Sequence, residues 1–236
     1  MNEESSPRSS RPPRIAPSLL SADFARLGDA VAACEEGGAD AIHFDVMDGR
    51  FVPTLTVGPL VLAALRKRTR IPFDVHLMVE EPFRTLEQYL DAGASRLAVH
   101  VEAEPHIHRF CQVVRSRGAV PGVAVNPATP LASVEEALLF ADFVLLMTVN
   151  PGWGGQKLIP ESPGKIARLS RLVAASGRDV EIAVDGGVTA ENIGILAAAG
   201  GDHFVAGAAV FGAADPASRI GELRRMALGE KLRGPA

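Results

Sequence analysis

Short apolar runs alternate with amphipathic stretches along the chain from Arg14 onward. Runs such as "DAIHFDV", "RLAVHV" and "DFVLLM" are hydrophobic on both faces, which is typical of parallel strands that are covered by helices. Between these runs, apolar residues recur with helical spacing, and glycine or proline separates most of the segments. The pattern therefore predicts repeated strand–helix units.

The repeat is regular enough to predict the architecture. Strands are expected to end near Ser18, Val46, Met78, His100, Val125, Met147, Asp185 and Ala206. Helices are expected at about 23–36, 58–69, 82–91, 105–117, 131–139, 162–176, 190–199 and 216–228. Eight such units favour an α/β fold of the (β/α)8 barrel type, as a single catalytic domain over 14–228. An open doubly wound sheet is the alternative, but no GxGxxG follows the first strand.

The composition and net charge of the chain argue against several classes of protein. The chain has 236 residues, 47% of them hydrophobic, and a net charge of -4, which disfavours a general nucleic-acid binder. No window is apolar for long enough to predict a membrane partner. Cys34 and Cys111 lie in helical patterns without metal-type spacing, so we expect a reduced, cytoplasmic protein. Residues 1–13 are rich in Ser, Pro and charge and are expected to be a disordered tail, and 229–236 a C-terminal tail.

Polar residues at predicted strand ends carry the candidate chemistry. His43 and Asp45 alternate on one face of a strand, His76 follows on the next strand, and Asp185 ends the seventh. Active sites of such barrels lie at the carboxyl ends of the strands, so these four side chains can converge there. Two imidazoles and two carboxylates suit one divalent ion, Zn, Fe, Mn or Co, which would compensate the buried charges.

Other polar residues have simpler interpretations. Asp48 has the opposite parity to Asp45 and precedes a glycine, so it is expected to cap a turn. His100 fits either a core histidine or a residue behind a metal ligand. His106, His108 and His203 are expected on the surface or on helices.

Methionines and glycines suggest how a substrate could be held. Met47, Met78 and Met147 fall at strand ends, where they could fill the core or form a dry wall over a planar anionic intermediate. The glycine-rich turns "NPGWGGQ", "DGGV" and "AGAAVFG" follow strands six to eight and could bind phosphate through backbone amides. The long loop 148–161 is either a mobile lid or a rigid phosphate turn.

The motifs "APSLLSADFARLG", "HFDVMDGRFVP", "DVHLMV", "NPATP", "LLMTVNPGWGGQ" and "VDGGV" resemble those of the ribulose-phosphate 3-epimerases, from Ile15 to about Met226. The resemblance implies a metalloenzyme of the pentose phosphate pathway that interconverts D-ribulose 5-phosphate and D-xylulose 5-phosphate, and it implies a homo-oligomer. It makes Asp45 and Asp185 the acid/base pair as well as metal ligands with His43 and His76. The substrate contacts that it implies are Ser18, His76, Gly152, Trp153, Gly154, Gly155, Gly186, Gly187, Gly207 and Ala208.

The chain departs from the family pattern at four positions. The family usually has Ser at Ala208, Phe at Trp153, Glu at Ala183 and Asn at Thr54. Ala208 lacks a hydroxyl that could contact phosphate, and Ala183 lacks an inward acid two residues before Asp185. Neither belongs to the expected metal and acid/base set, so the reaction class is expected to be retained.

Inversion at C3 of a 2-ketose requires one carboxylate on each side of that carbon, which Asp45 and Asp185 would supply around an enediolate. A similar epimerase acting on another ketose phosphate, such as D-allulose 6-phosphate, is the nearest alternative. A metal-free barrel lyase or decarboxylase would more naturally use a lysine at a strand end, whereas Lys157 and Lys165 fall in a loop and a helix. A non-catalytic sugar-phosphate binding module would not need acids on two sides of its ligand.

Overall fold

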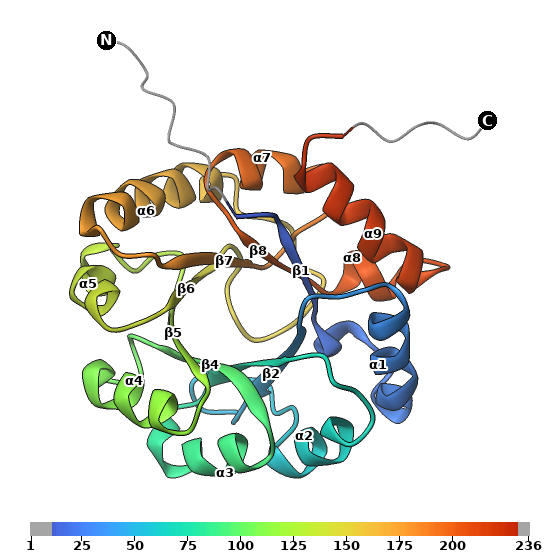
Figure 1. The fold of residues 1–236 in the computed structure, drawn as a ribbon, viewed down its shortest axis with the longest axis horizontal. Coiled ribbons are helices and arrows are strands. Elements are labelled where there is room, and N and C mark those ends of the chain that lie inside the picture. The colour runs from blue at the N-terminus through green and yellow to red at the C-terminus, as the bar shows by residue number, and fades with distance from the viewer. Residues whose placement is uncertain (1–10, 231–236) are drawn as a thin grey trace.

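Parallel strands form a ring at the centre of the molecule, and helices surround it on the outside (Figure 1). The computed structural model describes residues 11–230 of the chain. In this part the sheet has eight strands in the order β1-β8-β7-β6-β5-β4-β3-β2. Their bounds are β1 Arg14–Pro17, β2 Ile42–Met47, β3 Phe73–Met78, β4 Ala94–His100, β5 Val120–Val125, β6 Phe143–Met147, β7 Glu181–Asp185 and β8 His203–Ala206. The predicted single-domain (β/α)8 barrel is confirmed.

The ring closes between β1 and β2 through a single bridge between Ser18 and His43. All other neighbouring strands pair in parallel ladders, and the β3–β4 ladder has a register shift between Phe73 and Asp74. The closure therefore places Ser18, which follows β1, directly beside the polar residues of β2.

The helices follow the predicted order. Their bounds are α1 Leu27–Glu36, α2 Pro59–Arg66, α3 Leu86–Asp91, α4 Ile107–Ser116, α5 Ala132–Glu135, α6 Ser162–Ser176, α7 Ile193–Ala198, α8 Ala208–Phe211 and α9 Pro216–Ala227. Short 3-10 helices are η1 Leu19–Ser21, η2 Phe24–Arg26, η3 Pro82–Arg84 and η4 Glu136–Leu139. The expected helix 131–139 is split between α5 and η4, and 23–36 between η2 and α1, where Asp23 accepts a hydrogen bond from the amide of Ala25.

The barrel interior is filled by side chains and is not a pore. On its β5–β6 side, the ring of Phe143 packs so closely over Gly122 that a Cβ there would lie 2.2 Å from it. Phe143 belongs to a small buried apolar cluster with Leu145, Ala183 and Val205. These side chains fill the interior of the barrel, so within the described residues the barrel is open only at the carboxyl ends of the strands.

The expected tails, 1–13 and 229–236, lie mostly outside the described residues. Within residues 11–230, no helix combines the length and the apolar character needed to cross a bilayer.

Candidate active site

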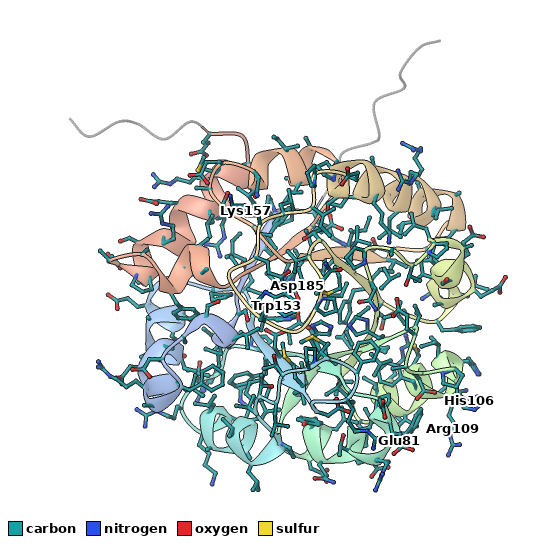
Figure 2. The ribbon with its side chains drawn as sticks, turned by 180° about the vertical axis from the view of Figure 1, so that it is seen from behind. Glu81, His106, Arg109, Trp153, Lys157 and Asp185 are labelled. Carbon is teal, nitrogen blue, oxygen red and sulfur yellow. The ribbon has the colours of Figure 1, made fainter. Side chains whose placement is uncertain are left out.

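A cavity of about 470 Å³ opens at the carboxyl ends of the strands. Asp185 and Trp153 lie over the centre of the ring, whereas Glu81, His106 and Arg109 lie at its periphery (Figure 2). The cavity is lined by most of the residues expected from sequence, namely Ser18, Asp45, Met47, Met78, Met147, Gly152, Trp153, Gly154, Gly155, Asp185, Gly186, Gly187, Gly207 and Ala208. His43 and His76 are buried beneath this lining.

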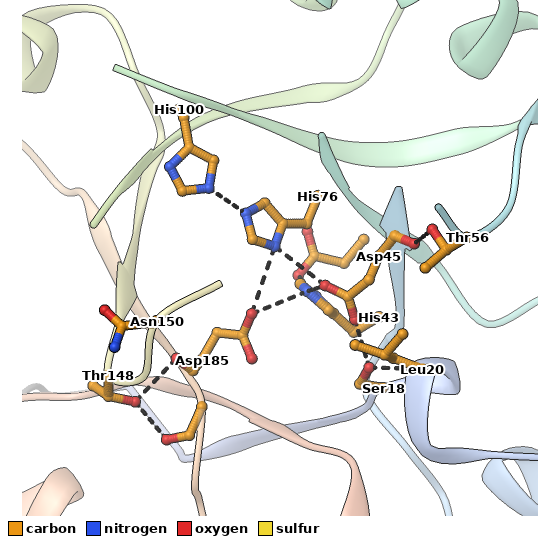
Figure 3. Close-up of polar contacts among 12 residues, drawn as sticks. Ser18, Leu20, His43, Asp45, Thr56, His76, His100, Thr148, Asn150 and Asp185 are labelled. Carbon is orange, nitrogen blue, oxygen red and sulfur yellow. Dashed lines mark hydrogen bonds and ion pairs between the residues drawn. The ribbon is translucent and has the colours of Figure 1, made fainter. Parts of the chain in front are cut away.

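The four expected metal ligands form one cluster (Figure 3). One ligand atom from each of His43, Asp45, His76 and Asp185 lies within 4.8 Å of all the others. Asp45 and His76 are direct neighbours in the β2–β3 ladder, which brings Oδ1 of Asp45 to 3.2 Å from Nδ1 of His76. Asp185 reaches the cluster from β7, with Oδ2 at 3.5 Å from the same nitrogen.

The donor set fits a divalent cation. Nε2 of His43 is buried, lies 3.3 Å from Oδ1 of Asp45 and 3.7 Å from Oδ2 of Asp185, and makes no hydrogen bond within the described chain. The other ring nitrogen, Nδ1, lies 3.3 Å from a carboxylate oxygen of Asp74. If Nδ1 carries the proton, Nε2 presents a lone pair to the cluster, as a metal ligand must. Two such imidazoles and two carboxylates suit the metals of the Zn, Fe, Mn and Co class.

The electrostatics of the cluster favour positive charge at its centre. Burial alone would raise the pKa of Asp45, but the charges and hydrogen bonds of His43 and His76 outweigh it and hold that pKa below its ordinary value. Burial would lower the pKa of each histidine, yet the neighbouring carboxylates raise both pKa values. Protons on the imidazoles and a metal ion are alternative ways of supplying that charge.

A series of hydrogen bonds holds the His76 ring at Nε2, the nitrogen that faces away from the cluster. Its Nε2 lies 2.9 Å from Nε2 of His100, and Nδ1 of His100 lies 3.1 Å from Oε2 of Glu102. Glu102 in turn accepts a hydrogen bond of 2.9 Å from the amide of Asn126. With Nδ1 of His76 facing the cluster, its Nε2–H donates to His100, whose Nδ1–H then donates to Glu102. Burial first of all lowers the pKa of His100, to about 4, which keeps this imidazole neutral.

The two candidate acid/base carboxylates are also fixed. The Ser18 hydroxyl donates to Oδ2 of Asp45 over 2.6 Å and accepts from the amide of Leu20 over 3.2 Å. The hydroxyl of Thr56 donates to the backbone carbonyl of Asp45, and that of Thr148 lies 3.0 Å from the carbonyl of Asp185. These contacts secure the strand ends that carry the carboxylates.

Glycine conformations shape the rim of the cavity. Gly186 and Gly187 have φ angles of 120° and 65°, which side-chain-bearing residues rarely adopt. A Cβ on Gly187 would lie 2.3 Å from the backbone nitrogen of Leu158, so the turn packs directly against the long loop. Within that loop, the side-chain amide of Gln156 donates to the carbonyls of Asn150 and Trp153. These hydrogen bonds hold the loop from within, and both alternatives for it, a mobile lid and a rigid phosphate turn, stay predictions.

The three methionines form an apolar wall beside the cluster. Met47 and Met78 are neighbours in the β2–β3 ladder, and Met147 ends β6. All three are buried and border the cavity. The methionines thus place apolar side chains beside the carboxylates, and their shielding of an intermediate from water stays a prediction.

Sequence reasoning placed some polar residues correctly and missed others. Asp48 caps a turn as expected, since Oδ1 accepts from the amides of Arg50 and Phe51. The expectation for His203 was wrong, because it begins β8 and is fully buried inside the barrel. Asp74 was missed, although it shares the inward parity of His76 two residues later.

Three comparisons place the chain among known proteins. The model of the ribulose-phosphate 3 epimerase family matches residues 14–211. Ribulose-phosphate 3-epimerase 1 of Cupriavidus necator is 52% identical over 88% of this chain and 88% of its own length. Ribulose-phosphate 3-epimerase of Bacillus subtilis is 49% identical over 89% of this chain and 98% of its own.

Among solved structures, a mutant tryptophan synthase alpha-subunit from Pyrococcus furiosus superimposes with a TM-score of 0.66, over 93% of this chain and 99% of that one. Its 17% identity supports the barrel fold alone. The family model matches most of the barrel, and the two relatives are about 50% identical to this chain over most of its length. The chain therefore belongs to the ribulose-phosphate 3-epimerase family.

Proposed function

We propose that this protein is an isomerase that interconverts D-ribulose 5-phosphate and D-xylulose 5-phosphate by epimerisation at C3. The observation that carries the proposal is the pair of carboxylates, Asp45 from β2 and Asp185 from β7, which meet at one cavity beside two histidines. The curated relatives bear the name of this activity.

The reaction removes the proton from C3, next to the ketone, and returns a proton to the opposite face. Asp45 takes the proton from one epimer and Asp185 delivers one from the other side, with reversed roles in the reverse direction. One carboxyl must be protonated while the other is ionised, so their titrations belong to the pair. The hydrogen bond from Ser18 keeps one oxygen of Asp45 occupied, which leaves its other oxygen, Oδ1, for the cluster.

His43, Asp45, His76 and Asp185 would hold a single divalent ion, Zn, Fe, Mn or Co. When bound, the cation supplies positive charge that stabilises negative charge developing on the substrate oxygens. The remaining groups act by position: His100 and Glu102 orient His76, and the methionine wall keeps water from the reacting carbon.

The substrate phosphate is proposed to lie on the glycine-rich rim formed by 152–155, Gly186, Gly187, Gly207 and Ala208. These segments border the cavity, and their backbone amides can donate to an anion where side chains are small. Lys157 also lines this part of the cavity and adds positive charge. Such local donors reconcile an anionic substrate with a chain of net charge -4.

Three further expectations complete the proposal. D-allulose 6-phosphate is the alternative substrate, but the names of the relatives do not favour it. Cys34 and Cys111 are buried free thiols, which supports a reducing, cytoplasmic setting. A homo-oligomer is proposed from family membership, and Leu55 and Leu60, exposed by 76% and 86%, are candidates for its interface.

The proposal is tested by a coupled assay of D-ribulose 5-phosphate conversion with protein stripped of metal by a chelator, before and after adding Zn²⁺, Fe²⁺, Mn²⁺ or Co²⁺. Activity that disappears and then returns supports both substrate and cation. Full activity without metal would leave the substrate assignment in place but contradict the shared-cation site. Absence of activity with every metal, together with turnover of D-allulose 6-phosphate, would favour the alternative.

A further inference from the structure

A second cluster of charged side chains lies inside the barrel, at the amino-terminal ends of the strands and beneath the candidate metal ligands. It consists of Arg14, Asp74, Arg96, Glu181 and His203, which we call the basal ion cluster. All except Arg14 are at least nine-tenths buried. Buried charges of this kind are costly unless they are paired, so their arrangement needs a reason.

The charges within the basal ion cluster are balanced. Nε of Arg96 lies 3.4 Å from Oδ1 of Asp74, and its terminal nitrogen pairs with Oε1 of Glu181. The second oxygen of Glu181 lies 3.1 Å from Arg14. Two guanidinium groups thus face two carboxylates, while His203 lies between the carboxylates at 3.4–3.6 Å. The cluster needs no metal ion of its own.

One member also touches the candidate metal site. Asp74 is the register neighbour of His43 in the β2–β3 ladder. Its Oδ2 lies 3.3 Å from Nδ1 of His43, while Oδ1 faces Arg96. The two oxygens therefore serve different partners. At this position Oδ2 of Asp74 can accept a hydrogen bond from Nδ1–H of His43, and in that tautomer Nε2 is the ring nitrogen with the free lone pair.

We propose that Asp74 is a positioning residue for His43: it fixes the ring orientation and the tautomer that presents Nε2 to the metal, and so sets the metal affinity of the site. This inference rests on the metal site of the proposed function. The unpartnered Nε2, aimed at Asp45 and Asp185, is the outcome expected of such a contact. A carboxylate that accepts from the distal nitrogen of a histidine ligand orients it and raises its basicity.

Glu181 offers a matched control within the same cluster. It is as buried as Arg96, carries the same charge as Asp74 and shares Arg96 and His203 with it as partners. Within residues 11–230, the hydrogen bonds and ion pairs of Glu181 go to Arg14, Arg96 and His203, and none goes to the four candidate ligands. A merely structural role of the basal ion cluster would make Asp74→Asn and Glu181→Gln equivalent.

The experiment measures Zn²⁺ affinity on chelator-stripped protein by competition with a chromophoric chelator, without any assay of turnover. Asp74→Asn is expected to weaken Zn²⁺ binding by roughly 10–100-fold. Glu181→Gln is expected to bind Zn²⁺ close to wild type, although both variants lower the unfolding midpoint. As a second readout, the visible spectrum of bound Co²⁺ should change in Asp74→Asn and not in Glu181→Gln.

Equal Zn²⁺ affinity in wild type and Asp74→Asn would overturn the inference while leaving the metal site intact. Failure of the wild type itself to bind Zn²⁺ would instead remove the metal site, and the inference with it. Should Asp74→Asn not fold because Arg96 loses a partner, the double variant Asp74→Asn/Arg96→Met removes both charges and leaves Arg14 paired with Glu181. The same loss of affinity is expected there, and wild-type affinity in the double variant would contradict the inference equally.

Discussion

The hydroxyl of Ser18 donates a 2.6 Å hydrogen bond to Oδ2 of Asp45, and both side chains are buried at the edge of the cavity. The contact crosses the closure of the barrel, where Ser18 and His43 form the only bridge between β1 and β2 in the described residues. A hydroxyl that donates to an ionised carboxylate makes one of the stronger side-chain hydrogen bonds. Ser18 is thus placed to control the orientation of a candidate base.

Ser18→Ala is expected to lower kcat by roughly tenfold, which corresponds to about 1–2 kcal/mol of lost stabilisation of the reactive geometry. The reason is that Asp45 loses the donor that fixes its second oxygen. Initial rates with D-ribulose 5-phosphate measure the effect at saturating metal. Ser116→Ala, at an exposed hydroxyl on α4, is the control and should keep the wild-type rate. An unchanged kcat in Ser18→Ala would show that the strand alone positions Asp45.

Removing one of the two carboxylates should separate proton removal from inversion. In Asp185→Asn, Asp45 can still exchange the C3 proton of one epimer with D₂O, whereas net epimerisation should fall by orders of magnitude. Asp45→Asn should show exchange only from the other epimer. Both are measured by NMR of substrate incubated in D₂O, with metal content determined in parallel because both residues are candidate ligands. Near-normal epimerisation by Asp185→Asn would contradict the two-base assignment.

The buried His203 should make the fold sensitive to acid. The pKa of His203 is lowered from the ordinary 6.5 to about 4, first by burial and then by the positive charge of Arg96. Arg14 lowers this pKa further, whereas the carboxylates of Asp74 and Glu181 raise it without reversing the shift. Between these two pH values the unfolded chain binds more protons than the folded one, so stability falls as the pH is lowered from 6.5 towards 4. We expect this group to contribute on the order of 2 kcal/mol to that loss.

Urea unfolding at the two ends of this pH range tests the effect in wild type and His203→Asn. The variant should lose less stability on acidification, because it no longer carries a neutral imidazole that must stay unprotonated in the fold. His106→Gln, at an exposed histidine before α4, should behave as the wild type. Identical pH profiles for all three proteins would show that His203 is not the acid-sensitive group.

The strand ends and the four candidate metal ligands could be predicted because both depend on residue patterns within single strands. A period of two is visible in the sequence, so the shared face of His43 and Asp45 could be stated before any strand pairing was known. The ends of parallel strands gather at one edge, which brought His76 and Asp185 into the same prediction. The observed cluster has these members because Asp45 and His76 are also register neighbours.

The basal ion cluster could not be predicted in the same way. Its partners come from β1, β3, β4, β7 and β8, and their meeting depends on the register of the ladders. The β3–β4 register shifts between Phe73 and Asp74, and this sets Asp74 against Arg96. A residue pattern within one strand carries no information about such a shift. For the same reason His203, at the first position of β8, was expected on the surface or on a helix.

The turn at Gly187 should be intolerant of a side chain because of contact as well as conformation. Gly187 and Gly177 share a φ of 65°, but a Cβ on Gly187 would meet the backbone of Leu158 at 2.3 Å, whereas a Cβ on Gly177 would meet nothing within 4 Å. Gly177→Ala therefore measures the conformational cost alone, about 1 kcal/mol. Gly187→Ala must in addition displace the loop 148–161 and should cost roughly 3 kcal/mol or more.

The two variants also separate stability from binding at the rim. Displacement of the loop removes amides from the proposed phosphate site, so Gly187→Ala should raise KM for D-ribulose 5-phosphate more than it lowers kcat, since the carboxylates lie on the strands beneath. Gly177→Ala, at the end of α6 and outside the cavity, should leave KM unchanged. Urea unfolding and steady-state kinetics on the same preparations measure both quantities. If Gly187→Ala lost stability but kept its KM, the phosphate would have to bind elsewhere on the rim, and the amides near Gly207 and Ala208 would become the site to test.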